Sequence, residues 1–198
     1  MTDLKQAFAE TREQLDKIIL AYRRGVPLPH PETLVWYRND TLSSFNIEGE
    51  LGQNSIPDKR NAVKVEIGTA VTSIGLAVFD GCSGLTSITI PNSVTRIGTG
   101  AFGSCSSLSS ITIPNSIMSI SDYAFTYCSS LTSITCQPTI APTVQIATFG
   151  DAIGAYTGYP TRGNNVLKIP RGATGYDSGA WLDPLQNASK CGFHIEYI

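Results

Sequence analysis

The sequence predicts a short β-solenoid, in which repeats of one length stack in a column, and a constant spacing of residues carries the prediction. Four sets of residues recur every 23 positions: Phe79, Phe102 and Phe125; Cys82, Cys105 and Cys128; Val65, Ile88, Ile111 and Ile134; and Ile74, Ile97 and Ile120. A period of this length with apolar residues in constant phase is typical of repeat proteins, whose units bury their apolar side against the next unit. We therefore expect a stack of parallel strands with β caps and an N-terminal α-helix.

Composition narrows the class of protein. The chain has 198 residues, which is long enough for one domain and an appendage. Its net charge is −2, and the charged fraction of 15% is low. No basic patch suggests a nucleic-acid partner, and no apolar run approaches the 18 residues of a membrane span. The N-terminus does not read as a secretory signal as it stands, so the protein is expected to stay inside the cell, to leave by lysis or assembly, or to have lost a leader.

Residues 1–25 are predicted to form a helix, with Asp3 as its N-cap and Gly25 as its stop. A heptad seam runs along it: Leu4, Phe8, Thr11, Leu15, Ile18 and Tyr22. The helix can self-associate as a coiled-coil stalk, which predicts a homo-oligomer, or it can dock on its own domain. Alternating prolines then predict an extended linker over 26–34.

Three segments are expected after the linker. Residues 35–62 contain two strand-like runs joined by the turn pair Asn39-Asp40 and are predicted to cap the first repeat. The repeats themselves are assigned to 63–136. Residues 137–198 are assigned to a C-terminal cap that contains a long Gly-rich loop, with Trp36, Tyr176 and Trp181 expected as core residues of the two caps.

The clearest repeat, LTSITIPNSVTRIGTGAFGSCSS at 85–107, carries Leu85, Ile88 and Ile90 at the Leu-x-x-Leu-x-Leu spacing of a leucine-rich-repeat strand. SITIPNSVTRIGTGAFGSCSSL and SITIPNSIMSISDYAFTYCSSL resemble the BspA-like class of bacterial leucine-rich repeats, found in surface proteins of oral and gut bacteria. SSFNIEGELGQNSIPDKRNAVKVEIGTAVTSIG is also similar to the entry cap of short leaderless relatives in gut phages and prophages. The resemblance implies a leucine-rich-repeat β-solenoid, and its phage-like part implies a virion or tail component.

Catalytic, cofactor and metal sites are not expected. The two histidines, His30 and His194, fall in the linker and in a terminal strand, and no cysteine pair has metal-ligand spacing. Gly98, Gly100 and Gly103 spell Gly-x-Gly-x-x-Gly, but the equivalent residues of the neighbouring repeats do not repeat it and no βαβ unit surrounds it. The cysteines of the repeat are expected to be buried thiols that pack as small hydrophobes, since a ladder of parallel side chains suits disulfide geometry badly.

Two surfaces are candidates for ligand binding. Strand alternation should send one pair of hydroxyls per repeat outward, next to Lys64 and Glu66. These are Ser87 and Thr89, Ser110 and Thr112, and Ser133 and Thr135. Such a hydroxyl ladder can also reflect β-propensity and solubility alone. The second candidate is the loop at 150–165, because Tyr156, Tyr159 and Arg162 are residue types enriched in binding hot spots, although the aromatics can instead cover the last repeat.

The function predicted is a non-enzymatic recognition or structural module. The favoured hypothesis is a phage virion component, in the tail or in host attachment, that binds protein or glycan on a cell surface or contacts other virion proteins. The alternative is a BspA-like adhesin on a bacterial surface. A hydrolase built on the loop at 150–165 is a third and weaker hypothesis. The expected location is accordingly the virion or the cell surface.

Overall fold

The computed structural model describes residues 32–145, 148, 165–176, 181 and 193–198, all within the unit Pro31–Ile198. The predicted helix at 1–25, most of the linker and most of the loop at 150–165 lie outside the described residues. The heptad seam and the loop residues Tyr156, Tyr159 and Arg162 therefore stay predictions.

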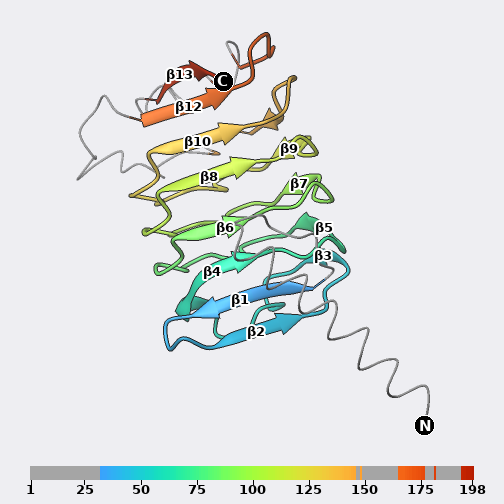
Figure 1. Cartoon of the computed structure of the whole chain (residues 1–198), viewed down its shortest axis with the longest axis vertical. Coiled ribbons are helices and arrows are strands. Elements are labelled where there is room, and N and C mark those ends of the chain that lie inside the picture. The colour runs from blue at the N-terminus through green and yellow to red at the C-terminus, as the bar shows by residue number, and fades with distance from the viewer. Residues whose placement is uncertain (1–31, 146–147, 149–164, 177–180, 182–192) are drawn as a thin grey trace, which may run out of the picture. The chain divides into compact units, whose positions relative to one another are not determined.

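Successive repeats lay one strand each, parallel and side by side, on one side of the stack (Figure 1). Repeat 1 (63–84), repeat 2 (85–107) and repeat 3 (108–130) are followed by a fourth, incomplete unit. Their strands are β4 (Ala62–Glu66), β6 (Ser87–Thr89), β8 (Ser110–Ile113) and β10 (Ser133–Cys136). The register pairs Lys64 with Ser87 and Ser110 with Ser133, so the 23-residue period of the sequence is the period of the strands.

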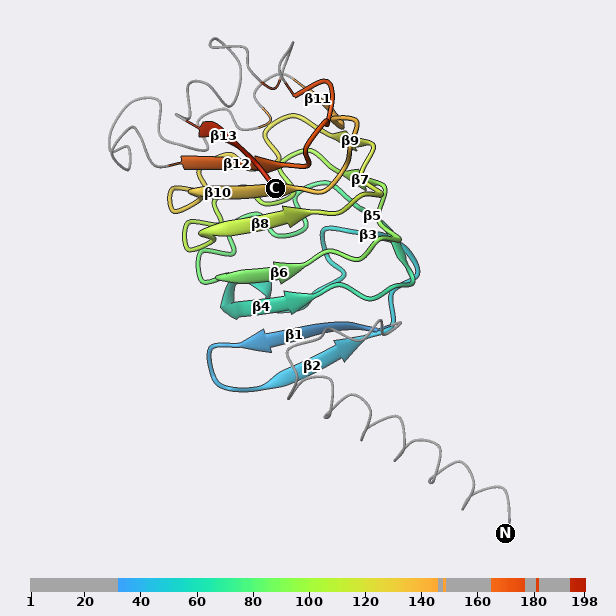
Figure 2. The same ribbon diagram turned by 45° about the horizontal axis from the view of Figure 1, so that its top comes forward.

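A second column of short parallel strands forms another side of the stack (Figure 2). Its members are β3 (Gly49–Leu51), β5 (Val71–Ile74), β7 (Arg96–Ile97), β9 (Ser119–Ile120) and β11 (Thr143–Val144). The register again joins residues one repeat apart, as in Ile74 beside Ile97 and Ile97 beside Ile120. The described residues therefore form a repeat β-rich fold with mostly parallel strands, and a 3₁₀ turn at Lys59–Asn61 precedes β4.

The remaining side of each repeat is a run of turns whose backbones hydrogen-bond directly to the next repeat. The amide of Phe79 donates to the carbonyl of Ala101 (2.8 Å), and the amide of Phe102 donates to the carbonyl of Ala124 (2.8 Å). In the fourth unit the carbonyl of Thr148 accepts from the amide of Phe125 (3.0 Å). Each repeat thus uses its neighbour to satisfy its backbone polar groups, which a buried chain must do.

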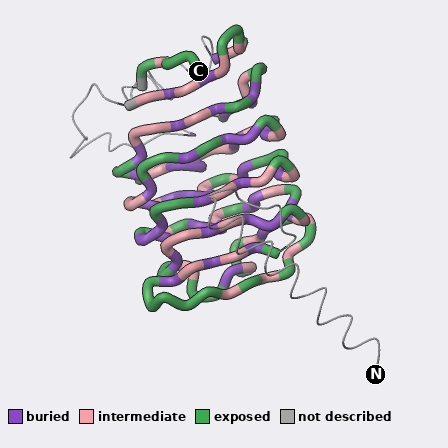
Figure 3. Tube along the Cα trace, in the orientation of Figure 1, coloured by how far each residue is buried: buried purple, intermediate pink, exposed green. Residues whose placement is uncertain are grey.

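The core is a stack of identical side chains from successive repeats. The rings of Phe79 and Phe102 are 5.3 Å apart and 6° from parallel, and those of Phe102 and Phe125 are 5.2 Å apart. All three are fully buried. Buried residues recur at the same places in successive repeats along the whole stack (Figure 3). Burying a phenylalanine contributes about 1.5–3 kcal/mol.

The strand side is divided between repeats 2 and 3. β6 ends one four-stranded sheet, ordered β2-β1-β4-β6, and β8 ends another, ordered β13-β12-β10-β8. The predicted isoleucine column is buried throughout, and the ladders join Ile88 to Val65 and Ile134 to Ile111. They do not join Ile88 to Ile111, so the strand side of the stack consists of two halves.

The N-terminal end of the stack is covered by an antiparallel hairpin. β1 (Thr33–Tyr37) pairs with β2 (Leu42–Phe45) on one side and with β4 on the other. The predicted turn at Asn39-Asp40 is present: Asp40 has a left-handed backbone (φ 61°), and the Thr41 hydroxyl donates to the Asn39 side-chain oxygen (2.7 Å). Short polar residues tolerate this conformation well.

Lys59 donates to two backbone carbonyls of the first repeat. Its ammonium donates to the carbonyls of Ala77 (2.8 Å) and Val78 (2.7 Å). Ala101 and Ala124, one and two repeats after Val78, accept from the preceding repeat instead. At Val78 the Lys59 ammonium therefore replaces the amide donor that a preceding repeat would supply.

Two further strands extend the stack beyond β10. β12 (Asn165–Ile169) pairs with β10, and β13 (Phe193–Tyr197) pairs with β12, both in parallel. The predicted cap-core residues Tyr176 and Trp181 are confirmed as buried, with ring centroids 5.1 Å apart. The Tyr176 hydroxyl donates to the carbonyl of Pro138 (3.0 Å), and the Trp181 indole N–H donates to the carbonyl of Pro142 (2.8 Å). These bonds satisfy both aromatic polar groups, as burial requires.

Candidate functional site

The six hydroxyl residues predicted as a ladder all lie on strands and outside the core. Ser87, Ser110 and Thr112 are exposed, and Thr89, Ser133 and Thr135 are half-buried. The alternation holds because the intervening isoleucines are buried on the opposite face of each strand. The register places Ser110 beside Ser133 and Thr112 beside Thr135. Since β6 belongs to the other sheet, the hydroxyls form a pair on β6 and a group of four on β8 and β10.

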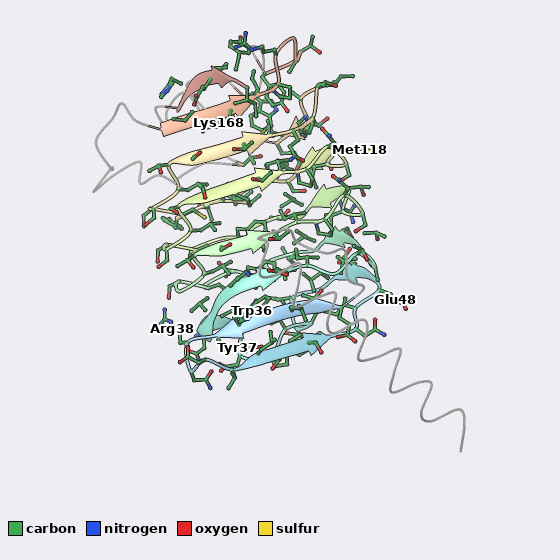
Figure 4. The ribbon with its side chains drawn as sticks, viewed as in Figure 1. Trp36, Tyr37, Arg38, Glu48, Met118 and Lys168 are labelled. Carbon is green, nitrogen blue, oxygen red and sulfur yellow. The ribbon has the colours of Figure 1, made fainter. Side chains whose placement is uncertain are left out.

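Charged residues bound this outward strand face at both ends. Lys64 and Glu66 stand beside Ser87 and Thr89 and form an ion pair with an N···O distance of 2.7 Å. At the other end Lys168 stands beside Thr135 and pairs with Glu196 at 3.8 Å. Figure 4 shows Trp36 on β1 and Lys168 on β12, toward opposite ends of the strand column. The outward strand face is thus uncharged in the middle and carries both signs of charge at each end.

Trp36 corrects one expectation, because it is not a core residue of the N-terminal cap. It is half-buried and pairs with Lys64 and with Leu42 on the outward strand face. The reason is strand alternation: Val35 and Tyr37 take the two inward positions of this part of β1. The ammonium of Lys64 lies 4.4 Å from the centroid of the Trp36 ring, a cation–π contact.

The turns between the strand columns contain two columns of left-handed residues. Ala77, Gly100 and Tyr123 occupy one column, with φ of 49°, 59° and 56°. Gly81, Ser104 and Tyr127 occupy the other, with φ of 76°, 57° and 56°. This conformation costs a side chain other than glycine about 1–2 kcal/mol, and it is rare for bulky residues. Repeat 3 places a tyrosine in both columns.

These two tyrosines were not among the residues predicted for a site. Tyr123 is 50% exposed and Tyr127 59%, so burial in the core does not account for them. The sequence contained a signal, since repeats 1 and 2 hold only alanine, glycine or serine at these positions and repeat 3 replaces both with an aromatic residue. From the sequence alone, the replacement of these small residues by tyrosines cannot be distinguished from ordinary divergence between repeats, because the φ angles are not known.

The glycine motif at 98–103 has a structural explanation. A Cβ on Gly98 would lie 2.7 Å from the carbonyl carbon of Gly75, and one on Gly103 would lie 2.6 Å from a carboxylate oxygen of Asp80. Gly100 takes the left-handed backbone described above. The glycines therefore serve close stacking of repeats 1 and 2, and no phosphate-binding βαβ unit surrounds them.

The repeat cysteines are free and fully buried, as predicted. The thiols of Cys105 and Cys128 donate to the carbonyls of Phe79 (3.2 Å) and Phe102 (3.1 Å) in the preceding repeat. Burial raises the pKa of Cys82 to about 11, although the nearby Lys59 cation opposes the shift, and burial raises the pKa of Cys136 to about 12. Such thiols are protonated at neutral pH and are poor nucleophiles.

Metal-binding and membrane-spanning features are missing from the part of the chain that the structure describes. Within the described ranges, no three His, Cys, Asp or Glu side chains gather as a metal site would require. No helix among the same residues is long and apolar enough to cross a membrane.

Comparison with protein families matches this geometry. The family model described as BspA type leucine rich repeat region matches residues 49–151 in six copies. No curated protein matches the chain. The matched range covers β3 to β11 and includes both strand columns, the phenylalanine stack and the left-handed turns. The chain therefore belongs to the family of BspA-type leucine-rich repeats.

Proposed function

We propose that this protein is a non-enzymatic binding module that recognises protein or glycan through its outward strand face. Leucine-rich repeats of this type typically bind and do not catalyse, and they are commonly associated with cell surfaces. We further propose that the repeats form a β-solenoid, in which the strands of successive repeats lie on the same side.

One observation carries the choice of surface: the hydroxyls of β8 and β10 form an uncharged block with charge beyond it at both ends. Ser110, Thr112, Ser133 and Thr135 stand in two adjacent pairs on neighbouring strands. A block of this kind offers hydrogen-bond donors and acceptors at regular spacing, and binding through it requires no burial of unpaired charge. The ion pairs at both ends can fix the orientation of a ligand.

Substitution of the hydroxyl block tests the proposal. Thr112→Lys and Thr135→Lys each place a long charged side chain within the hydroxyl block without touching the core. We expect binding to immobilised extracellular proteins and glycans to weaken at least tenfold, with an unchanged melting temperature. Thr72→Lys, at an exposed residue of β5 in the other strand column, is the matched control. Equal binding by all three variants would rule out this face as the binding surface.

The setting of the module is also a proposal. A virion component of the tail or host-attachment apparatus is supported by the resemblance of the segment before repeat 2 to short phage and prophage relatives. A bacterial surface adhesin is supported by the family itself. Tail and baseplate genes beside the gene for this chain would favour the virion, and an export leader in front of Met1 would favour the adhesin.

A stalk formed by the predicted helix at 1–25 would make the binding module multivalent. Its seam residues Leu4, Phe8, Leu15, Ile18 and Tyr22 offer an apolar stripe for self-association. Weak single-site binding would then gain avidity without new contacts. Light scattering of the full chain beside a chain that begins at Glu32 tests this. If both are monomers at micromolar concentration, the stalk proposal fails.

A further inference from the structure

We propose that Tyr123 and Tyr127 form a binding site for a neutral saccharide on the turn side of repeat 3, separate from the outward strand face. The inference rests on the proposed function as a binding module and adds a second site, with a ligand class, to it.

The first step is that the turn does not need tyrosine. In repeat 3 the amide of Thr126 donates to the carbonyl of Tyr123 (3.0 Å). The equivalent bonds run from Asp80 to Ala77 (3.3 Å) in repeat 1 and from Gly103 to Gly100 (2.9 Å) in repeat 2. The same turn therefore forms with alanine, glycine or tyrosine at its left-handed position, and the bulkiest of the three is the least suited to it.

The second step is that the tyrosines are held in place although they stay exposed. Ala124 and Phe125 lie between them and are fully buried, and the Phe125 ring stacks on Phe102. The backbone of the turn is thereby anchored to the core, while Tyr123 and Tyr127 remain 50% and 59% exposed. Backbone outliers that the surrounding structure enforces cluster at binding sites, where rigid side chains reduce the entropy lost on binding.

The third step is the surface beside the rings. The amides of Gly100 and Ser104 donate to the carbonyls of Asp122 (3.0 Å) and Thr126 (2.7 Å), so repeat 2 lies directly against the tyrosine turn. Its residues here that reach the surface, Thr99, Gly100 and Ser104, are small, while Gly103 is buried under the Asp80 carboxylate. The tyrosine turn is therefore bordered on the repeat 2 side by three surface residues without a bulky side chain.

The chemistry of repeat 3 selects the ligand class. Its one charged residue is Asp122, so the repeat supplies no cation for a phosphate, sulfate or carboxylate group. Tyrosine offers an apolar ring face and a hydroxyl, which suits the C–H face and the hydroxyls of a sugar. The Asp122 amide donates to the Gln145 side-chain oxygen (3.3 Å), so two polar residues lie where the chain enters the tyrosine turn.

A protein partner fits this site less well. A standard protein interface buries about 800 Å² on each partner, whereas a fully buried tyrosine contributes about 150–250 Å². The strip of small residues beside Tyr123 and Tyr127 adds no large apolar side chain. The apolar area offered is therefore of the size of one or two sugar rings.

The test measures binding of the full chain to a panel of neutral oligosaccharides, namely gluco-, manno-, galacto- and N-acetylglucosamine oligomers, with sulfated and sialylated oligomers beside them. We expect at least one neutral oligomer to bind, and Tyr123→Gly and Tyr127→Gly each to weaken that binding at least tenfold. Tyr123→Phe should retain most of it. Ala77→Gly, in the same left-handed column as Tyr123 but in repeat 1 and without an aromatic ring, is the matched control and should leave binding unchanged.

Thermal melting separates recognition from a structural role. Because glycine accepts the left-handed backbone, Tm of the two glycine variants should hold or rise, by up to about 2–4 °C for a protein of this size. A fall of that size would show that the tyrosines stabilise the turn and would overturn the proposal. It is equally overturned if no neutral oligomer binds, if only acidic oligomers bind, or if Ala77→Gly weakens binding as much.

The outcomes also distinguish this inference from the proposed function. Thr112→Lys and Thr135→Lys should leave oligosaccharide binding at the tyrosines intact. If they abolish binding of a neutral oligomer while Tyr123→Gly and Tyr127→Gly do not, the strand face is the saccharide site and the tyrosine site is wrong. If the tyrosine variants lose binding of an extracellular protein and no sugar binds, the partner class is wrong.

Discussion

The interior of the repeat stack and its N-terminal end meet the same physical requirement in different ways. Inside the stack, each repeat satisfies its backbone and buries its phenylalanine against another repeat with the same residues. At the N-terminal end the earlier repeat is incomplete: β3 continues the second strand column, a hairpin pairs with β4, and the ammonium of Lys59 binds two carbonyls of repeat 1. The interior is therefore stabilised by contacts between equivalent residues of successive repeats. The N-terminal end is stabilised instead by individual contacts that are not part of the repeat pattern.

The largest effect is expected from a cavity in the interior. Phe102→Ala removes the middle ring of the stack, between Phe79 and Phe125, and should lower the free energy of unfolding by about 3–5 kcal/mol. Urea unfolding followed by circular dichroism measures it. Thr99→Ala, exposed in the same repeat, should change stability by less than about 0.5 kcal/mol. A loss under about 1 kcal/mol for Phe102→Ala would contradict the stacked core.

A smaller loss is expected at the end of the stack. Lys59→Met keeps the length of the side chain and removes the ammonium, which leaves the carbonyls of Ala77 and Val78 without this donor. The free energy of unfolding should fall by about 1.5–3 kcal/mol, since these hydrogen bonds involve a charged group. Arg60→Met removes the adjacent exposed cation and should change stability by less than about 0.5 kcal/mol. Equal losses in both variants would mean that net charge, and not capping, matters.

Two glycines sharpen the comparison between interior and end. Gly98→Ala brings a methyl group to 2.7 Å from the backbone of Gly75, which cannot move without shifting repeat 1, so a loss of about 1–3 kcal/mol is expected. Gly84→Ala meets the guanidinium of Arg38, an exposed side chain that can move aside, and should cost less than about 0.5 kcal/mol. Thermal melts of the two variants side by side would refute this ranking if Gly84→Ala were the more damaging.

The smallest effect concerns the pH dependence of stability. Burial raises the pKa of Cys82 from its ordinary value of 9.0 to about 11. Above pH 9 the thiol ionises in the unfolded state but not in the folded state. This ionisation lowers the free energy of the unfolded state, so the free energy of unfolding falls as the pH rises from 9 toward 11. The contribution between pH 8 and pH 10 is about 1 kcal/mol. Urea unfolding at pH 8 and pH 10 measures this. Between these two pH values the free energy of unfolding should fall by about 1 kcal/mol less for Cys82→Ala than for the wild type. An identical fall would contradict the raised pKa of Cys82.

The sequence by itself determined the repeat length, the inward residues and the outward hydroxyls. It could do so because a stacked repeat places each residue beside its counterpart 23 positions away, so the repeat spacing alone identifies the packing partners. The turn at Asn39-Asp40, the buried thiols and the cap aromatics Tyr176 and Trp181 were predicted for similarly local reasons. The strand face assigned to Ser87, Thr89 and the four hydroxyls after them followed from alternation alone.

Tertiary structure decided what does not repeat. The division between β6 and β8, the outward position of Trp36 and the carbonyls bound by Lys59 each depend on contacts between segments whose spacing follows no period. The left-handed backbone of Tyr123 and Tyr127 is decided in the same way, because neighbouring repeats impose it on residues that would avoid it alone. Local conformational preference and the 23-residue period relate a residue only to its equivalents in the other repeats. The features named here depend instead on contacts between residues that are not related by the repeat.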